Sequence, residues 1–223
     1  MKNGPSFNPS KTGMAKLAHA RSVISDLAQH EVMLISDLAG CPQTFLASEC
    51  VKYASAGESV EAGGHAMGCP ATLVPSKAVI VAFVVDRAGN TFVWHDGLYK
   101  ARADFSLEHY VGTDSIVYGF AFDEGTRPGP VVRLFDACRL RGECLLGLNC
   151  FERFGRLFEG MSAASRSRTS AVRLHWVWTE GWIKEFVLCK PTERLHGLDC
   201  DWQCAIRLPD QLSPTARYHK LDL

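Results

Sequence analysis

Residues 131–160 read VVRLFDACRLRGECLLGLNCFERFGRLFEG, and this stretch decides the fold class of the chain. Its first eight residues are mostly apolar, which predicts a buried strand over 131–138. Gly142 predicts a tight turn directly after that strand. The apolar positions of residues 151–158 then follow the spacing of a short helix. A strand, a turn and a helix in succession indicate that both kinds of element build the domain.

Further strands are predicted on both sides of this stretch. Apolar or β-branched runs bounded by turn residues predict strands at 78–86, 91–95, 115–123, 172–178, 182–188 and 203–208. The first two should pair as a hairpin. Trp176 and Trp178 are two residues apart, so we expect them on one face of their strand. The sum predicts an α+β fold with mostly antiparallel β-sheets and flanking helices.

The N-terminal part of the chain has a different pattern. Residues 1–13 hold two Pro, two Gly and few apolar groups, which predicts an extended arm. Residues 14–39 carry apolar side chains at roughly helical spacing, which predicts a helix. Residues 54–76 are expected to begin the main domain as a long irregular connection. We therefore divide the chain into an arm at 1–13, a helical segment at 14–53 and a main domain at 54–223.

Composition narrows the function classes. The 223 residues are 47% hydrophobic and 22% charged, as in a globular protein with a sizeable core. The formal net charge of zero argues against a protein that grips many phosphates, but it leaves one nucleotide or a short RNA end open. Without a long apolar run or an apolar leader, we expect no membrane partner and an intracellular place in cytoplasm or nucleus, or in a virion.

The nine Cys suggest neither disulfides nor a metal centre. Their number is odd, and with no sign of export they are expected to be reduced thiols. His196, Cys200 and Cys204 form H-x3-C-x3-C, a spacing that departs from those of zinc sites. We therefore assign no metal site and expect no cofactor.

The order of motifs resembles that of mRNA-capping guanylyltransferases and of ATP- or GTP-dependent ligases. In that family a Phe-Asp strand leads through a turn Gly into a helix with Glu-Arg, as residues 135–136, 142 and 152–153 do here. Residues 186–191 resemble a later aliphatic strand, and residues 206–209 resemble the last motif, a strand ending in Pro. The resemblance covers about residues 69–214 and is stronger to the non-catalytic cap-binding domain of the snurportin family. It implies a nucleotidyltransferase-like fold.

The groups that perform nucleotidyl transfer in this family are missing. The family's Lys-x-Asp-Gly motif, whose Lys attacks the α-phosphate, occurs nowhere, and the nearest string has Trp94 in the place of the Lys. The strand that ends in Asp-Gly-Glu in the family reads Tyr-Gly-Phe at 118–120. The retained motif residues, up to Pro209, are those expected to hold the fold together. We therefore assign no catalytic residue.

A binding role would use aromatic and basic side chains. A methylated guanine carries positive charge and stacks on electron-rich rings, while strand-end cations of the resembling fold face the nucleotide. The candidate ligand-binding residues are Trp202, Lys77, Lys190, Arg207 and Trp94.

Three functions stay open at this point. The first is a non-catalytic module that binds an RNA 5′ cap or a guanine nucleotide. The second is a structural subunit of a larger assembly, such as a ribonucleoprotein or a virion, with protein partners at the N-terminal arm and helix. The third is a residual nucleotidyltransferase, which the missing Lys disfavours.

Overall fold

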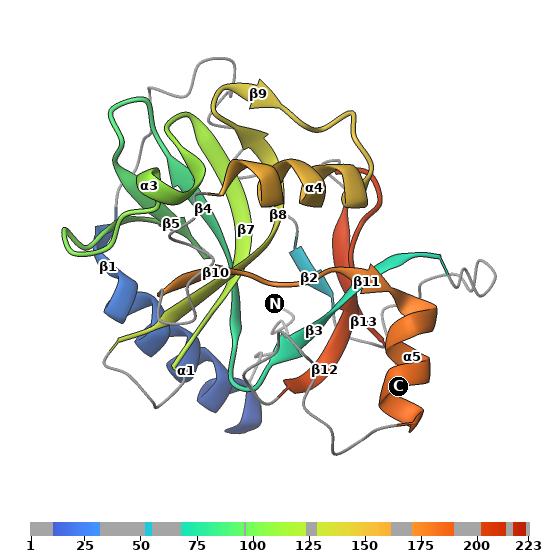
Figure 1. Ribbon diagram of the computed structural model, residues 1–223. Helices are drawn as coiled ribbons and strands as arrows, with labels where there is room; N and C mark the ends of the chain where they lie inside the picture. Colours follow the sequence, from blue (N-terminus) through green and yellow to red (C-terminus); the bar gives the residue numbers. More distant parts are fainter. Residues whose placement is uncertain are drawn as a thin grey trace, which may run out of the picture.

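Two β-sheets packed face to face form the centre of the molecule, and helices lie on their outer sides (Figure 1). The computed structural model describes residues 11–31, 52–54, 68–95, 97–123, 129–161, 171–189, 202–212 and 216–221. Within these ranges the predicted α+β class with mostly antiparallel sheets is confirmed.

The larger sheet has its strands in the order β1-β6-β5-β4-β7-β8-β10, and β9 pairs with β8. All its pairs are antiparallel except β8 with β10. The predicted hairpin is confirmed, since β4 pairs with β5 in antiparallel register. The bounds are β1 Ala28–Glu31, β4 Val79–Val85, β5 Thr91–Trp94, β6 Leu98–Ala101, β7 Ser115–Phe122, β8 Val131–Leu140, β9 Glu143–Cys144 and β10 Val172–Leu174.

The smaller sheet has the order β11-β3-β12-β13-β2 and is antiparallel except for the pair of β13 with β2. Its strands are β2 Lys52–Ala54, β3 Pro70–Pro75, β11 Trp178–Thr179, β12 Trp202–Arg207 and β13 Arg217–Leu221. The helices are α1 Lys11–Leu27, α3 Glu108–Val111, α4 Cys150–Gly160 and α5 Glu180–Cys189. None of the described helices is long and apolar enough to span a membrane.

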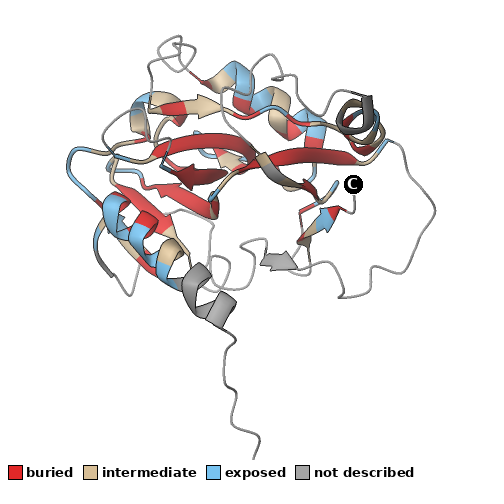
Figure 2. Cartoon of the chain, turned by 90° about the horizontal axis from the view of Figure 1, so that it is seen from below, coloured by how far each residue is buried: buried red, intermediate tan, exposed pale blue. Residues whose placement is uncertain are grey.

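Three apolar clusters hold these layers together. One lies between the two sheets, where rings of the larger sheet meet Tyr218 of the smaller one. The second lies between the larger sheet and helices α1, α3 and α4. The third lies between the smaller sheet and α5. Buried residues are accordingly concentrated in the strands, and exposed ones on the outer sides of the helices (Figure 2).

The chain segment between β10 and β11 joins the two sheets. The backbone N–H of His175 donates to the carbonyl of Leu134 in β8, at 2.7 Å. The ring Nε2–H of His175 donates to the carbonyl of Leu73 in β3. One buried residue thus bonds to both sheets, and the hydroxyl of Thr72 adds a 2.7 Å bond to the carbonyl of Trp176.

Four sequence predictions need correction. The helix expected at 14–39 ends at Leu27, because residues 28–31 instead pair with the free edge of β6. The strand expected at 182–188 is helix α5, which is stabilised by a Glu180–Lys184 ion pair at i,i+4 spacing. The strand expected at 172–178 is broken at 175–177, where the chain crosses between the sheets. The irregular connection expected at 54–76 contains strand β3, whose six residues are all buried.

The centre of β7 has no room for a side chain at Gly119. Strand β8 carries bulges against β7, one of them beside Gly119, and a bulge bends its strand. A Cβ atom on Gly119 would lie 2.8 Å from the carbonyl oxygen of Arg133 and 2.9 Å from Cδ2 of Leu134. The glycine of the Tyr-Gly-Phe string therefore serves the packing of two strands.

We predict that Gly119→Ala lowers the free energy of unfolding by on the order of 1–3 kcal/mol, because the backbone of β8 must shift. The matched control is Gly147→Ala, where an added Cβ meets nothing within 4 Å, and which should change it by less than about 0.5 kcal/mol. Urea unfolding of both variants measures the difference. Equal effects of the two substitutions would refute the steric argument.

A second prediction concerns His175 and pH. Burial, above all, lowers the pKa of His175 to about 3, below the value of about 6.5 in an unfolded chain. Below pH 6.5 the unfolded chain binds a proton at this histidine and the folded chain does not. The free energy of unfolding therefore falls as the pH falls toward 3. The expected slope from this residue is about 1.4 kcal/mol per pH unit. His175→Gln, which keeps an N–H donor but does not titrate, should flatten the measured curve between pH 6.5 and 5 by that amount.

Candidate functional site

Among the candidate ligand-binding residues, Trp94 is separated from Trp202 and Arg207 by the smaller sheet. Lys190 lies outside the described residues. Trp94 of β5 packs against the apolar cluster between the two sheets. Trp202 of β12 packs against the cluster under α5, on the outer face of the smaller sheet. The smaller sheet thus lies between the two rings, and they cannot hold one ligand between them.

Arg207 is held by an ion pair on the outer face of the smaller sheet. Its guanidinium lies 2.7 Å and 2.9 Å from a carboxylate oxygen of Glu180, at the start of α5. Lys184 reaches the other oxygen of that carboxylate at 2.8 Å. Burial acts to raise the pKa of Glu180, but the hydrogen bonds from Lys184 and Arg207 outweigh it and the pKa is lowered. Arg207 therefore anchors α5 on β12.

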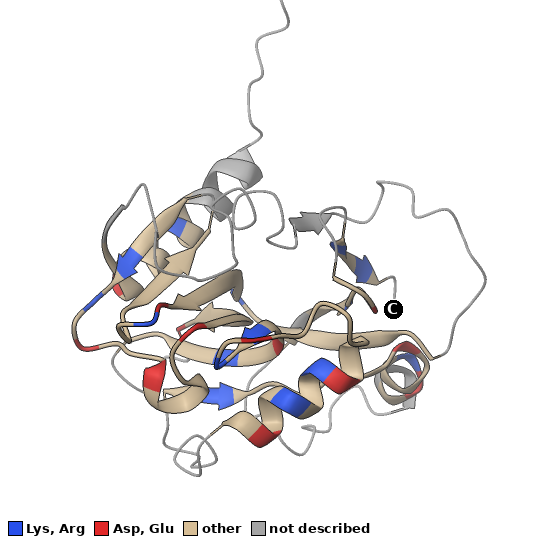
Figure 3. Cartoon of the chain, turned by 90° about the horizontal axis from the view of Figure 1, so that it is seen from above, with Lys and Arg blue, Asp and Glu red and all other residues tan. Residues whose placement is uncertain are grey.

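Lys77 lies at the turn between β3 and β4, two residues after Pro75, which pairs with Trp202 of β12. It is exposed and has a positive φ of 61°, a conformation uncommon outside glycine. Its carbonyl faces ring atom Nε2 of His19 in α1 at 2.7 Å. Lysine and arginine are interspersed with acidic residues over the described elements (Figure 3). In the described ranges, no group of three or more His, Cys, Asp or Glu could hold a metal ion.

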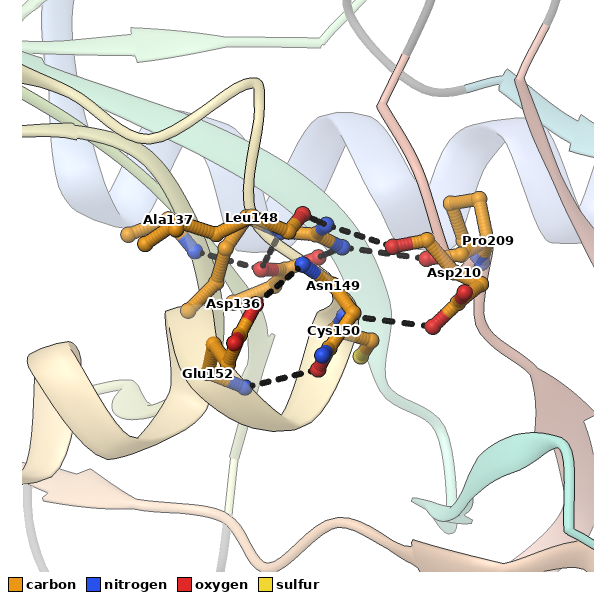
Figure 4. Close-up of polar contacts among 9 residues, drawn as sticks. Asp136, Ala137, Leu148, Asn149, Cys150, Glu152, Pro209 and Asp210 are labelled. Carbon is orange, nitrogen blue, oxygen red and sulfur yellow. Dashed lines mark hydrogen bonds and ion pairs between the residues drawn. The ribbon is translucent and has the colours of Figure 1, made fainter.

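The retained motif residues meet in one buried network (Figure 4). Arg153 of α4 makes a two-pronged ion pair with Asp136 of β8, at 2.8 Å and 2.9 Å, and both side chains are fully buried. The same guanidinium donates to the carbonyls of Leu148, Pro209 and Asp210 at 2.7–3.0 Å. Burial raises the pKa of Asp136, and the bonds from Arg153 and from the backbone N–H of Ala137 oppose that shift.

The start of α4 is fixed by a capping box. The side chain of Asn149 accepts from the backbone N–H of Glu152 at 3.0 Å, and the Glu152 carboxylate accepts from the backbone N–H of Asn149 at 2.9 Å. Gly142 turns the chain with a φ of 84°. The prediction that the retained motif residues hold the fold together is confirmed for Asp136, Arg153 and Gly142.

We predict that Arg153→Met lowers the free energy of unfolding by about 3–5 kcal/mol, because Asp136 is left as a buried charge without its partner. The control on the same helix is Arg156→Met, whose half-exposed pair with Glu143 spans 4.0 Å and should be worth less than about 1 kcal/mol. A double variant with Asp136→Leu should lose less than the sum of the two single variants. Additive losses would contradict a coupled pair.

Sequence reasoning missed two groups of aromatic side chains. Phe151, Phe154 and Phe158 of α4 and Trp176 form what we call the aromatic face. Trp176 is 41% exposed, and its ring centroid lies 5.9 Å from that of Phe154 and 6.1 Å from that of Phe158. Phe151 and Phe158 are 39% and 37% exposed. The 151/154/158 spacing in a predicted helix was the signal available for this face.

The second group is a stack of rings beside α5. Trp178 and Trp182 are nearly parallel, with centroids 5.2 Å apart, and Trp182 and Phe186 are likewise stacked at 5.3 Å. Trp176 and Trp178 therefore lie in different surroundings, and the expectation that they share one face of a strand is wrong. Neighbouring rings of this stack lie too close together for a nucleotide base to fit between them.

No family model matches the chain, and no curated protein matches it. Among solved structures, the chain is similar to the crystal structure of the ligase domain of LigD from M. tuberculosis, with 14% sequence identity and a TM-score of 0.45. The match covers 76% of this chain and 59% of that chain. At this TM-score the likeness carries no argument, so the functional conclusion depends on the residues of this chain.

Proposed function

We propose that the chain is a nucleotidyltransferase-like domain without catalysis that serves as a protein-binding subunit of a larger assembly. Of the functions that the sequence leaves open, the second is favoured by the arrangement of side chains. The aromatic face is the observation that carries the proposal, because exposed clusters of large apolar side chains are typical of protein interfaces.

The packing between the sheets supports the same conclusion. A nucleotide-transferring site needs an open cleft that holds a nucleophile and cations. Here the ring of Tyr218 in the smaller sheet packs edge-on against Phe135 and Tyr118 of the larger one, at centroid distances of 5.6 Å and 6.4 Å. Side chains fill the space where these strands meet.

The distribution of cations points in the same direction. Arg207 and Lys184 are both engaged by the carboxylate of Glu180. Trp202 packs under α5, and Lys77 is exposed at the turn that follows β3. The cations on the same face as Trp202 are thus already paired with Glu180. A ligand that combined a stacked base with several phosphates would need cations that can pair with the phosphates.

The first test asks for catalysis and cap binding. The chain is incubated with α-labelled GTP or ATP and a divalent metal, and we expect no label to survive denaturation. Tryptophan fluorescence is then titrated with methylated cap analogues up to millimolar concentration, and we expect no saturable quenching. A covalent adduct, or quenching that Trp202→Ala removes, would overturn the proposal.

The second test asks for protein contact at the aromatic face. A photo-crosslinking phenylalanine analogue replaces Phe158 in the cells that make the protein, and the same analogue replaces the exposed Ala103 as the control. We expect a discrete crosslinked species from position 158 and none from position 103. No crosslink from position 158, or equal crosslinks from both, would contradict a protein-binding face there.

A further inference from the structure

Helix α4 contains a glycine that the fold of this chain does not require. Glycine in the middle of a helix is destabilising relative to alanine. Gly155 has no left-handed φ, and a Cβ atom added to it would meet nothing within 4 Å. No neighbour inside the described molecule thus explains the absence of a side chain. As far as the described residues go, the surface at Gly155 is open to contact with another molecule.

That surface is the aromatic face. On a helix with 3.6 residues per turn, Gly155 lies on the same side as Phe151, four residues before it, and Phe158, three residues after it. The opposite side of the helix, with Cys150, Arg153 and Leu157, is buried. The face therefore presents a notch at Gly155 between two exposed rings.

A surface that carries both a notch and flanking protrusions is complementary to itself. In a pair related by a two-fold axis, the same surface of each subunit contacts the other. If two α4 helices cross at Gly155, the backbones approach closely, and the Phe151 and Phe158 rings of each copy pack beside the glycine of the other. This arrangement removes apolar rings from water, which favours association.

The charges beside the notch determine the direction of the pair. Glu152, Arg156 and Glu159 follow one another along the exposed margin of α4, next to Gly155. In a parallel two-fold pair, the charged margin of each copy would lie beside the Phe151 and Phe158 rings of the other, where it meets no opposite charge. In an antiparallel pair centred on Gly155, Arg156 comes within a turn of Glu152 of the second copy. Opposite charges at this spacing attract each other, and the dipoles of two antiparallel helices attract each other as well.

We propose that the aromatic face binds a second copy of this chain, through antiparallel contact of two α4 helices at Gly155. The proposal rests on the proposed function, because it names the partner of the same face. It assigns Gly155 the role of the contact point and Phe151, Phe158 and Trp176 the role of its apolar surroundings.

The test measures the mass of the full chain in solution by light scattering and by sedimentation between about 1 and 100 µM. We expect a concentration-dependent rise from the 24.6 kDa of one chain toward twice that mass. Gly155→Leu fills the notch and should weaken the dimer at least tenfold, while Gly147→Leu, outside α4, should leave it unchanged.

Two outcomes would overturn the dimer. One is a chain that stays monomeric at 100 µM, and the other is a dimer that Gly155→Leu and Phe158→Ser leave equally tight. Phe158→Ser replaces an exposed ring and serves as the test if Gly155→Leu fails to fold. The crosslinker at position 158 separates this proposal from the function. A crosslinked species heavier by another protein's mass refutes the dimer and supports the function, whereas no crosslink refutes both.

Discussion

The ion pair of Asp136 with Arg153 is the contact on which the arrangement of the molecule depends. It is fully buried, and a buried charge is tolerated only when its partner and its hydrogen bonds are all in place. Arg153 reaches β8 through Asp136, and it reaches the chain after β12 through the carbonyls of Pro209 and Asp210. One side chain thus fixes α4 to both sheets. The position of the aromatic face follows, because it is the other side of the same helix.

The motif order predicted Asp136 and Arg153 as residues that hold the fold together, because they are retained from the resembling family, but it did not predict that they pair. It could not predict the carbonyls of Pro209 and Asp210 as partners, since they depend on where a distant loop ends. The antiparallel α+β class and the β4–β5 hairpin were predictable from local patterns. It was not predictable that Trp94 and Trp202 lie on different faces of the smaller sheet. The face on which a side chain lies depends on strand register, which the neighbouring strands determine.

The wrong assignment of residues 182–188 has a particular physical origin. A short apolar run is compatible with either a buried strand or a helix when only hydrophobicity is considered. Two pairs at i,i+4 spacing decide the matter here, Glu180 with Lys184 and Trp182 with Phe186. Ile183 is then directed into the cluster under the smaller sheet. In a strand, residues four apart share a face but lie about 13 Å from each other, too far for either pair to form. The side-chain pairs, and not the composition, therefore select the helix.

Gly119 in β7 and Gly155 in α4 differ in whether packing inside the molecule excludes a side chain. Gly119 is required by the fold, because the backbone of β8 lies where its side chain would be. Gly155 faces open space, so the interior places no demand on it. Rings fill the contact between the sheets and helices cover their outer sides, so the outside of α4 is a surface that a partner can reach. On α4 that outside is aromatic and notched, which makes a packed protein surface a better fit than a phosphate-bearing ligand.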